Sequence, residues 1–197
     1  MEDCLEVVPP PEELVGAGVK VLILDFDGVL ACVRVDWGYV RGRLSEVLGF
    51  RVASILKLLR ESYGTPTHRV VSEFVKHFEE AGLRGSKPTS FATTYLPKAF
   101  EAGLRAYVAT MQESGTAEEF LRRWGLRRYL TGVLGRESFS CKAEMVRHIL
   151  RVEGVSGREV FMIDDSLRNV AEASGLGVRC VACVARECVN ARRGGED

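Results

Sequence analysis

Two carboxylates, one residue apart, follow an apolar run near the start of the chain. The run covers residues 19–24, and the sequence DFDGVL comes next, at residues 25–30. Acidic groups directly after a buried strand are unfavourable unless something uses them. A carboxylate can attack an electrophilic centre, and it can also give or take a proton. Asp25 and Asp27 are therefore our first candidates for catalytic residues.

Three further signals stand at the ends of other predicted elements. Thr110 closes the next apolar run, Lys142 starts a predicted helix, and the pair Asp164 and Asp165 closes a later run. In open α/β sheets, ligands bind at the carboxyl ends of the strands. Each signal alone has an ordinary interpretation: a strand-end Thr, a solvated Lys, or acidic residues at a helix start. Their order and spacing favour a shared site.

The apolar runs that carry these residues predict the strands of a parallel sheet. They lack polar alternation, which is typical of strands buried on both faces. The predicted strands cover residues 19–24, 104–110, 133–134, 160–163 and 178–184. Helical patterns alternate with them, so we expect an α/β fold with helices on both faces of the sheet.

Three helices are predicted between these strands. A capping box, TAEE at residues 116–119, predicts a helix that starts at Thr116. Residues 142–152 place an apolar stripe on one face. A shorter helix over residues 166–174 ends at Gly175, because glycine commonly terminates helices.

A long segment after the first strand interrupts this alternation. Residues 36–88 contain three successive amphipathic helical patterns and no strand candidate. Glycine and proline at residues 82–88 mark the return of the chain to the sheet. We predict two parts: an α/β core made by residues 1–33 and 89–197, and a small helical subdomain over residues 34–88.

The order of the four motifs resembles that of the haloacid dehalogenase superfamily. DFDGVL after an apolar strand, a strand-end Thr, a Lys and a strand-end Asp pair follow one another in that superfamily's order. The resemblance extends from Val19 to Val184 and implies a Rossmann-like core. It also implies that the inserted helices are a cap, placed between the first and second motifs.

The resemblance implies a role for each motif residue in a magnesium-dependent phosphohydrolase. Asp25 would attack phosphorus and form an aspartyl-phosphate. Asp27 would protonate the leaving alcohol and later take a proton from water. Thr110 and Lys142 would hold the phosphoryl group by a hydrogen bond and a positive charge.

The resemblance also implies a site for Mg²⁺. Its ligands would be the Asp25 side chain, the Asp27 backbone carbonyl and Asp165, with Asp164 acting through water. The fourth motif departs from one common form of the family, because Asn169 stands where many members have a further acid. The adjacent Asp pair supplies two carboxylates instead, and the division of labour between them stays open.

The residue at position 27 separates branches of the superfamily. Dehalogenases lack a carboxylate there and ATP-driven pumps carry Thr, whereas phosphatases and phosphomutases carry Asp. Asp27 therefore implies phosphate-ester hydrolysis, with a phosphomutase or a catalytically silent binding relative as alternatives. The expected substrate is a small phosphorylated metabolite. Trp37 and Arg41 follow the first motif and are candidates for recognising that substrate.

Composition argues against several other classes of function. Acidic and basic residues number 27 each, so no global positive field favours nucleic acid or anionic lipid. The apolar runs are too short to span a membrane, and the N-terminus lacks a secretory pattern. We therefore expect a cytoplasmic protein, and the sequence leaves its oligomeric state open.

The cysteines fit neither a zinc site nor a disulfide-rich scaffold. We expect Cys180 and Cys183 to lie in or at the end of a buried strand. Asn and Gln are scarce, which is a mild hint of a thermophilic source, where intracellular disulfides do occur. A bridge that involves Cys4 or Cys188 is therefore left open.

Overall fold

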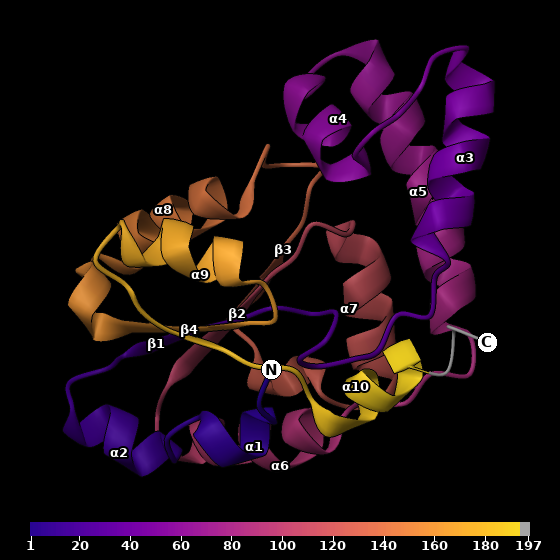
Figure 1. Cartoon of the computed structure of the whole chain (residues 1–197). Helices are drawn as coiled ribbons and strands as arrows, with labels where there is room; N and C mark the ends of the chain where they lie inside the picture. Colours follow the sequence, from indigo (N-terminus) through magenta and orange to yellow (C-terminus); the bar gives the residue numbers. More distant parts are fainter. Residues whose placement is uncertain (194–197) are drawn as a thin grey trace.

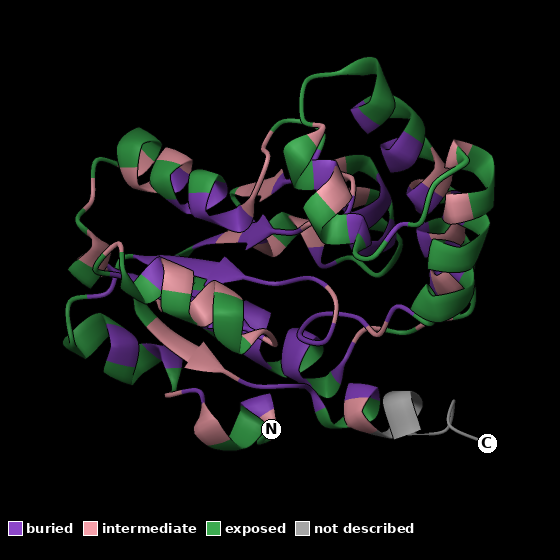
Figure 2. Ribbon diagram, turned by 45° about the horizontal axis from the view of Figure 1, so that its top comes forward, coloured by how far each residue is buried: buried purple, intermediate pink, exposed green. Residues whose placement is uncertain are grey.

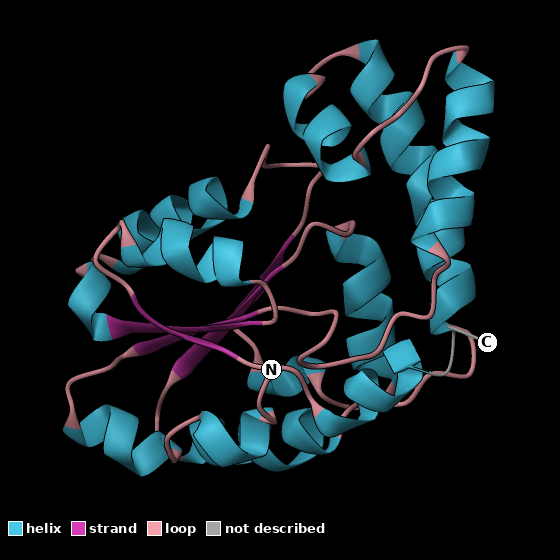
Figure 3. Ribbon diagram, viewed as in Figure 1, coloured by secondary structure: helices cyan, strands magenta, loops and turns pink. Residues whose placement is uncertain are grey.

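A parallel sheet between two layers of helices forms the centre of the molecule (Figures 1 and 3). The computed structural model describes residues 1–193, with residues 190–193 described by their backbone alone. The sheet in this range has five strands in the order β3-β2-β1-β4-β5. They are β1 Val21–Leu24, β2 Arg105–Ala109, β3 Gly132–Leu134, β4 Val160–Asp164 and β5 Arg179–Ala182. The predicted α/β fold is confirmed.

The two faces of the sheet are covered by different helices. One hydrophobic cluster joins the sheet to helices α8 and α9, and a larger cluster joins the opposite face to helices α1, α2, α6 and α7. The helices of the core are α1 Cys4–Val7, α2 Pro11–Gly16, α6 Ser90–Glu101, α7 Ser114–Arg123, α8 Lys142–Glu153, α9 Leu167–Ser174 and α10 Arg186–Arg193. Two short 3-10 turns, η1 Arg127–Tyr129 and η2 Gly157–Glu159, connect strands to helices.

The central strand β1 contributes to both clusters. Leu22 and Leu24 pack on the face with α2, α6 and α7, whereas Val21 and Ile23 pack on the face with α8 and α9. Successive side chains of a strand point to opposite faces, so a strand covered on both sides is apolar throughout. Each such fully buried side chain stabilises the fold by about 1.5–3 kcal/mol.

Three helices between β1 and β2 form a separate layer at one end of the molecule, called here the α3–α5 insertion. They are α3 Trp37–Leu48, α4 Ile55–Glu61 and α5 Pro66–Leu83. Their apolar stripes meet in a cluster of their own, and Figure 2 shows exposed residues over much of their outer surface. The linker from the core to the insertion meets the last turn of α5, where the Arg34 N–H donates to the Gly82 carbonyl at 3.3 Å. A Cβ at Gly82 would lie 2.7 Å from the Arg34 carbonyl oxygen, so this crossing requires glycine.

Helix α7 differs from its prediction. It begins at Ser114 with Glu113 as the N-cap, so the predicted start at Thr116 is wrong. The Ser114 N–H and hydroxyl donate to the carboxylate of Glu137 at 3.1 and 2.5 Å, and these bonds hold the first turn in place. Thr116 lies inside the helix, where its buried hydroxyl has no hydrogen-bond partner among the described residues.

Two disulfides tie the ends of the described chain to the core. Cys4 pairs with Cys183, directly after β5, and Cys32 pairs with Cys188 in α10. Cys180 lies in β5 and Cys183 directly follows it, as expected, but this edge strand is exposed or half-buried along its length, so the expectation of a buried strand is wrong. Among the described residues, no helix is long and apolar enough to cross a membrane.

Candidate active site

The motif residues meet at the carboxyl end of the sheet. Strand β1 pairs in parallel with both β2 and β4, and Leu24 stands opposite Val108 on one side and Ile163 on the other. Asp25 directly follows Leu24. This register brings Asp25 beside the ends of both neighbouring strands, which carry Thr110 and Asp164.

Lys142 connects the first and fourth motifs from the start of α8. Its Nζ lies 2.6 Å from Asp25 Oδ2 and 2.6 Å from Asp164 Oδ2. The side chain is buried, which by itself lowers the pKa of a lysine, but the two carboxylates outweigh burial and raise the pKa of Lys142 above its usual value. The ammonium group therefore stays charged at neutral pH.

Asp25 is held by both of its oxygens. Oδ1 accepts a hydrogen bond from the Phe26 N–H at 2.7 Å, and Oδ2 faces Lys142. Burial, followed by the charge of Asp164, raises the pKa of Asp25 well above its usual range, while Lys142 opposes the shift. The carboxylate is thus fixed in orientation at the edge of the sheet.

A cluster of acidic oxygens suits a hard divalent cation. Asp25, Asp164 and Asp165 each offer a carboxylate oxygen, and these oxygens lie within 4.8 Å of one another. One ammonium group neutralises only part of their charge, which is unfavourable in a buried place. Mg²⁺ prefers oxygen ligands of this kind, so the donor set fits the expected metal.

The two acids of the fourth motif have different surroundings. Asp164 is fully buried, and its Oδ1 accepts hydrogen bonds from the Ser166 N–H at 2.9 Å and from Asn169 Nδ2 at 3.0 Å. Asp165 is half-buried and lines the cleft above the sheet. Asn169, at the position that departs from the common family form, thus supports Asp164 through its amide.

Asp27 and Thr110 complete the predicted set. Asp27 Oδ1 accepts a hydrogen bond from the Val33 N–H at 2.9 Å, which closes the loop after β1. Thr110 is buried, and its Oγ1 accepts a hydrogen bond from the Gln112 N–H at 3.1 Å. Each side chain is therefore tied to the backbone of its own loop.

A cleft of about 870 Å³ lies over these residues, with walls from both the sheet edge and the α3–α5 insertion. Its volume is in the range of small-molecule sites. Trp37 and Arg41 both line it, as do most of the motif residues: Asp25, Asp27, Thr110, Lys142 and Asp165. Asp164 lies beneath the surface of the cleft. The structure thus brings the predicted candidates into one place.

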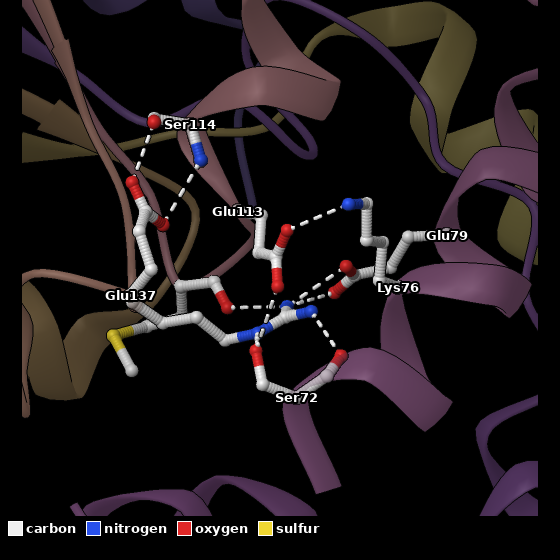
Figure 4. Close-up of polar contacts among 8 residues, drawn as sticks. Ser72, Lys76, Glu79, Glu113, Ser114 and Glu137 are labelled. Atoms are coloured by element: carbon white, nitrogen blue, oxygen red, sulfur yellow. Dashed lines mark hydrogen bonds and ion pairs between the residues drawn. The ribbon is translucent and has the colours of Figure 1, made fainter. Parts of the chain in front are cut away.

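A buried charged pair beside the cleft, Arg136 and Glu79, was not predicted from the sequence. Arg136 Nη1 lies 2.7 Å from Glu79 Oε1 and 2.8 Å from Oε2 (Figure 4). The position of each residue in the sequence nevertheless indicated that it could be buried near the sheet. Glu79 continues the apolar spacing of Val71 and Val75 on α5, and Arg136 closely follows the end of β3.

Arg136 links the insertion to the loop that follows Thr110. Its Nε donates to Ser72 Oγ at 2.8 Å, and its Nη2 donates to the Ser72 carbonyl at 2.9 Å. Nη1 also donates to the Met111 carbonyl at 3.0 Å. Lys76, on the same helix, pairs with Glu113 at 3.0 Å (Figure 4). Helix α5 is therefore attached to the sheet edge by charged and polar contacts.

Known proteins are similar to this chain in sequence. A family model described as haloacid dehalogenase-like hydrolase matches residues 22–183. A 5'-nucleotidase of Pseudomonas aeruginosa is 26% identical over 145 residues, which make up 71% of this chain and 64% of that protein. This chain thus spans less than two thirds of that relative's length.

Solved structures share the fold at low sequence identity. A predicted phosphatase from Clostridium acetobutylicum superposes with a TM-score of 0.64 at 16% identity, over 88% of this chain and 90% of that chain. A HAD family enzyme from Bacteroides thetaiotaomicron, in complex with magnesium and inorganic phosphate, gives a TM-score of 0.57 at 16% identity, over 86% and 96%.

The matched region runs from β1 to the residue after β5 and includes all four motifs. The Rossmann-like sheet and the family resemblance are both confirmed by the matches and by the strand order. The chain belongs to the haloacid dehalogenase-like hydrolases.

Proposed function

We propose that this enzyme hydrolyses a small phosphomonoester with Mg²⁺ and an aspartyl-phosphate intermediate. The observation that carries the proposal is the position of Asp25, which is buried, oriented by two partners and placed at the floor of the cleft. A carboxylate held in this way is prepared for in-line attack on phosphorus.

In the first step, a carboxylate oxygen of Asp25 bonds to phosphorus while the bond from phosphorus to the leaving oxygen breaks. Asp27 gives its proton to that oxygen, so the alcohol leaves neutral. In the second step, Asp27 takes a proton from water, and the water oxygen bonds to phosphorus. Asp25 is released as a carboxylate together with inorganic phosphate.

Charge on the transferring phosphoryl group has to be balanced throughout. Lys142 and Thr110 supply a cation and a hydroxyl from the cleft floor. Bound Mg²⁺ would supply further positive charge, held by Asp25, Asp165 and the Asp27 carbonyl. The exposure of Asp165 to the cleft supports it as the direct ligand. Asp164, buried and bonded to Lys142, is better placed to act through water and to orient that lysine.

We also propose that residues 34–88 act as a cap on a core of residues 1–33 and 89–197. The insertion supplies Trp37 and Arg41 to the cleft wall, so it is in position to select the leaving group. Because the Pseudomonas aeruginosa relative is named a 5'-nucleotidase, nucleoside 5'-monophosphates belong in a substrate screen beside sugar and organic-acid phosphates.

The direct test is hydrolysis of p-nitrophenyl phosphate by purified protein, with Mg²⁺ and with EDTA. We expect release of nitrophenol that requires Mg²⁺, needs no bisphosphate activator and is abolished by Asp25→Asn. A requirement for a bisphosphate would favour a phosphomutase. Activity that survives Asp25→Asn would reject the proposed nucleophile, and inactivity with every ester in the screen would favour a silent binding relative.

A further inference from the structure

Gln112 has a buried carboxamide that the protein does not use. The residue is 5% exposed, and neither Oε1 nor Nε2 has a hydrogen-bond partner among the described residues. A buried amide without partners is unfavourable, and each such group in a folded protein calls for an explanation. Replacement by an apolar side chain of the same length would remove this penalty.

The backbone around Gln112 is, in contrast, well bonded. The Gln112 N–H donates to Thr110 Oγ1 at 3.1 Å, and its carbonyl accepts a bond from the Arg136 N–H at 3.0 Å. Gly135 passes so close that a Cβ there would lie 2.7 Å from the Gln112 carbonyl oxygen and 2.3 Å from the Ser114 nitrogen. The position of Gln112 is thus fixed by the site itself, and only its side chain lacks partners.

The location of Gln112 indicates a role for its unpaired amide in the cleft. Gln112 lines the cleft, in company with Thr110 on its own loop and Glu79 on α5. Thr116 offers a comparison within the same molecule, because its buried hydroxyl is also unpaired. Thr116 lies inside α7 and is not among the residues that line the cleft.

We propose that Gln112 is a specificity-determining residue whose carboxamide hydrogen-bonds a hydroxyl on the leaving alcohol of the substrate. A carboxamide is both donor and acceptor, and a hydroxyl complements it in both roles. The several rotatable bonds of the side chain let the amide turn toward the cleft while the bonded backbone stays in place. The inference rests on the proposed phosphohydrolase activity and adds a substrate class, esters of polyhydroxy alcohols.

The test compares two esters that differ only in hydroxyl groups, glycerol 1-phosphate and n-propyl phosphate. We expect the wild-type enzyme to favour glycerol 1-phosphate in kcat/KM by about tenfold or more, because a site built to bond a hydroxyl rejects the analogue without it. Gln112→Met should abolish most of this preference through a fall in kcat/KM for glycerol 1-phosphate. Its Tm should equal or exceed that of the wild type.

Thr116→Val is the matched control, since it removes the other unpaired polar group. It should keep the preference for glycerol 1-phosphate and should not lower the Tm. A wild type that uses both esters equally, or a preference that survives in Gln112→Met, would overturn the role of Gln112. Hydrolysis of p-nitrophenyl phosphate that depends on Asp25, measured on the same preparations, separates that result from a failure of the proposed function.

Discussion

Arg136 and Glu79 form an ion pair that joins the sheet edge to the α3–α5 insertion almost out of contact with water. The Arg136 side chain is 1% exposed and the Glu79 side chain 3%, with Nη1 at 2.7 Å from Oε1. Burial raises the pKa of Glu79 to about 7, although the charge of Arg136 acts in the opposite direction. The pair therefore fixes two parts of the molecule together while its own burial remains unfavourable.

The first prediction concerns the two halves of this pair. Arg136→Met leaves the Glu79 carboxylate buried without its partner, so we expect the free energy of unfolding to fall by about 3–5 kcal/mol. In the double variant Arg136→Met with Glu79→Leu, both charges are gone, and most of that loss should be regained. Urea denaturation of the wild type, both single variants and the double variant measures the coupling. A double variant no more stable than Arg136→Met would contradict this account.

The second prediction is a pH dependence of stability that originates at Glu79. A carboxyl group whose folded pKa is raised to about 7 from 4.5 binds its proton more tightly in the folded protein. Its contribution to stability is therefore fully present below about pH 4.5 and is lost as pH rises through 7. From the size of the shift in the Glu79 pKa, the contribution to the free energy of unfolding is about 3 kcal/mol. Glu113 and Asp27 also raise this pKa, in the same direction as burial.

The measurement is the free energy of unfolding of wild type and Glu79→Gln between pH 5 and pH 8. The amide does not titrate, so the difference between the two profiles should change across this range as the wild type loses stability. Other titrating groups such as His68 are common to both proteins and largely cancel. Parallel profiles would place the pKa of Glu79 near its ordinary value.

The sequence was sufficient to predict those structural features that follow a local repeat of residue types. The five strands were predicted from apolar runs without alternation, although only β1 and β4 are buried along their whole length. The three inserted helices were predicted because their apolar stripes follow helical spacing. The motif residues follow from the same elements, since parallel strands end at one edge. To predict that Asp25, Thr110 and Asp164 lie close together, it was enough to locate the ends of their strands.

The features that were missed depend on partners distant in sequence. Arg136 and Glu79 are 57 residues apart, and no local pattern pairs them. The start of α7 is set by Glu137 from beyond β3, which overrides the local capping signal at Thr116. The unpaired amide of Gln112 is likewise a property of its surroundings. Nothing in the sequence distinguishes Gln112 from a glutamine whose side chain is exposed to water.

The third prediction concerns Lys142, which lies 2.6 Å from two carboxylates. Lys142→Met removes the cation shared by Asp25 and Asp164, so we expect kcat on p-nitrophenyl phosphate to fall by at least about a hundredfold. Added Mg²⁺ should not restore the rate, because the lysine and the metal balance charge at different atoms. Lys98→Met on the exposed surface of α6 is the control and should retain full activity. Recovery of Lys142→Met at high Mg²⁺ would show that any cation suffices there.

The fourth prediction is that reductant lowers thermal stability without stopping catalysis. The cysteines of Cys4–Cys183 and Cys32–Cys188 are 179 and 156 residues apart in the sequence. The chain-entropy model gives about 5 kcal/mol for one loop of this length. Neither bridge includes a motif residue. The Tm should therefore fall on reduction, while Mg²⁺-dependent hydrolysis at 25 °C persists.

Variants distinguish the bridges from the free thiols. Cys4→Ala with Cys183→Ala should lower the Tm in the absence of reductant, whereas Cys141→Ala with Cys180→Ala should leave the response to reductant intact, because these two cysteines are unpaired. Thiol titration of the oxidised, denatured wild type should detect the two free cysteines, and all six after reduction. Six reactive thiols before reduction, or a Tm insensitive to reductant, would show that the ends of the chain are held by packing alone. In that case Cys188 and Cys183 would stabilise the protein only as buried apolar residues.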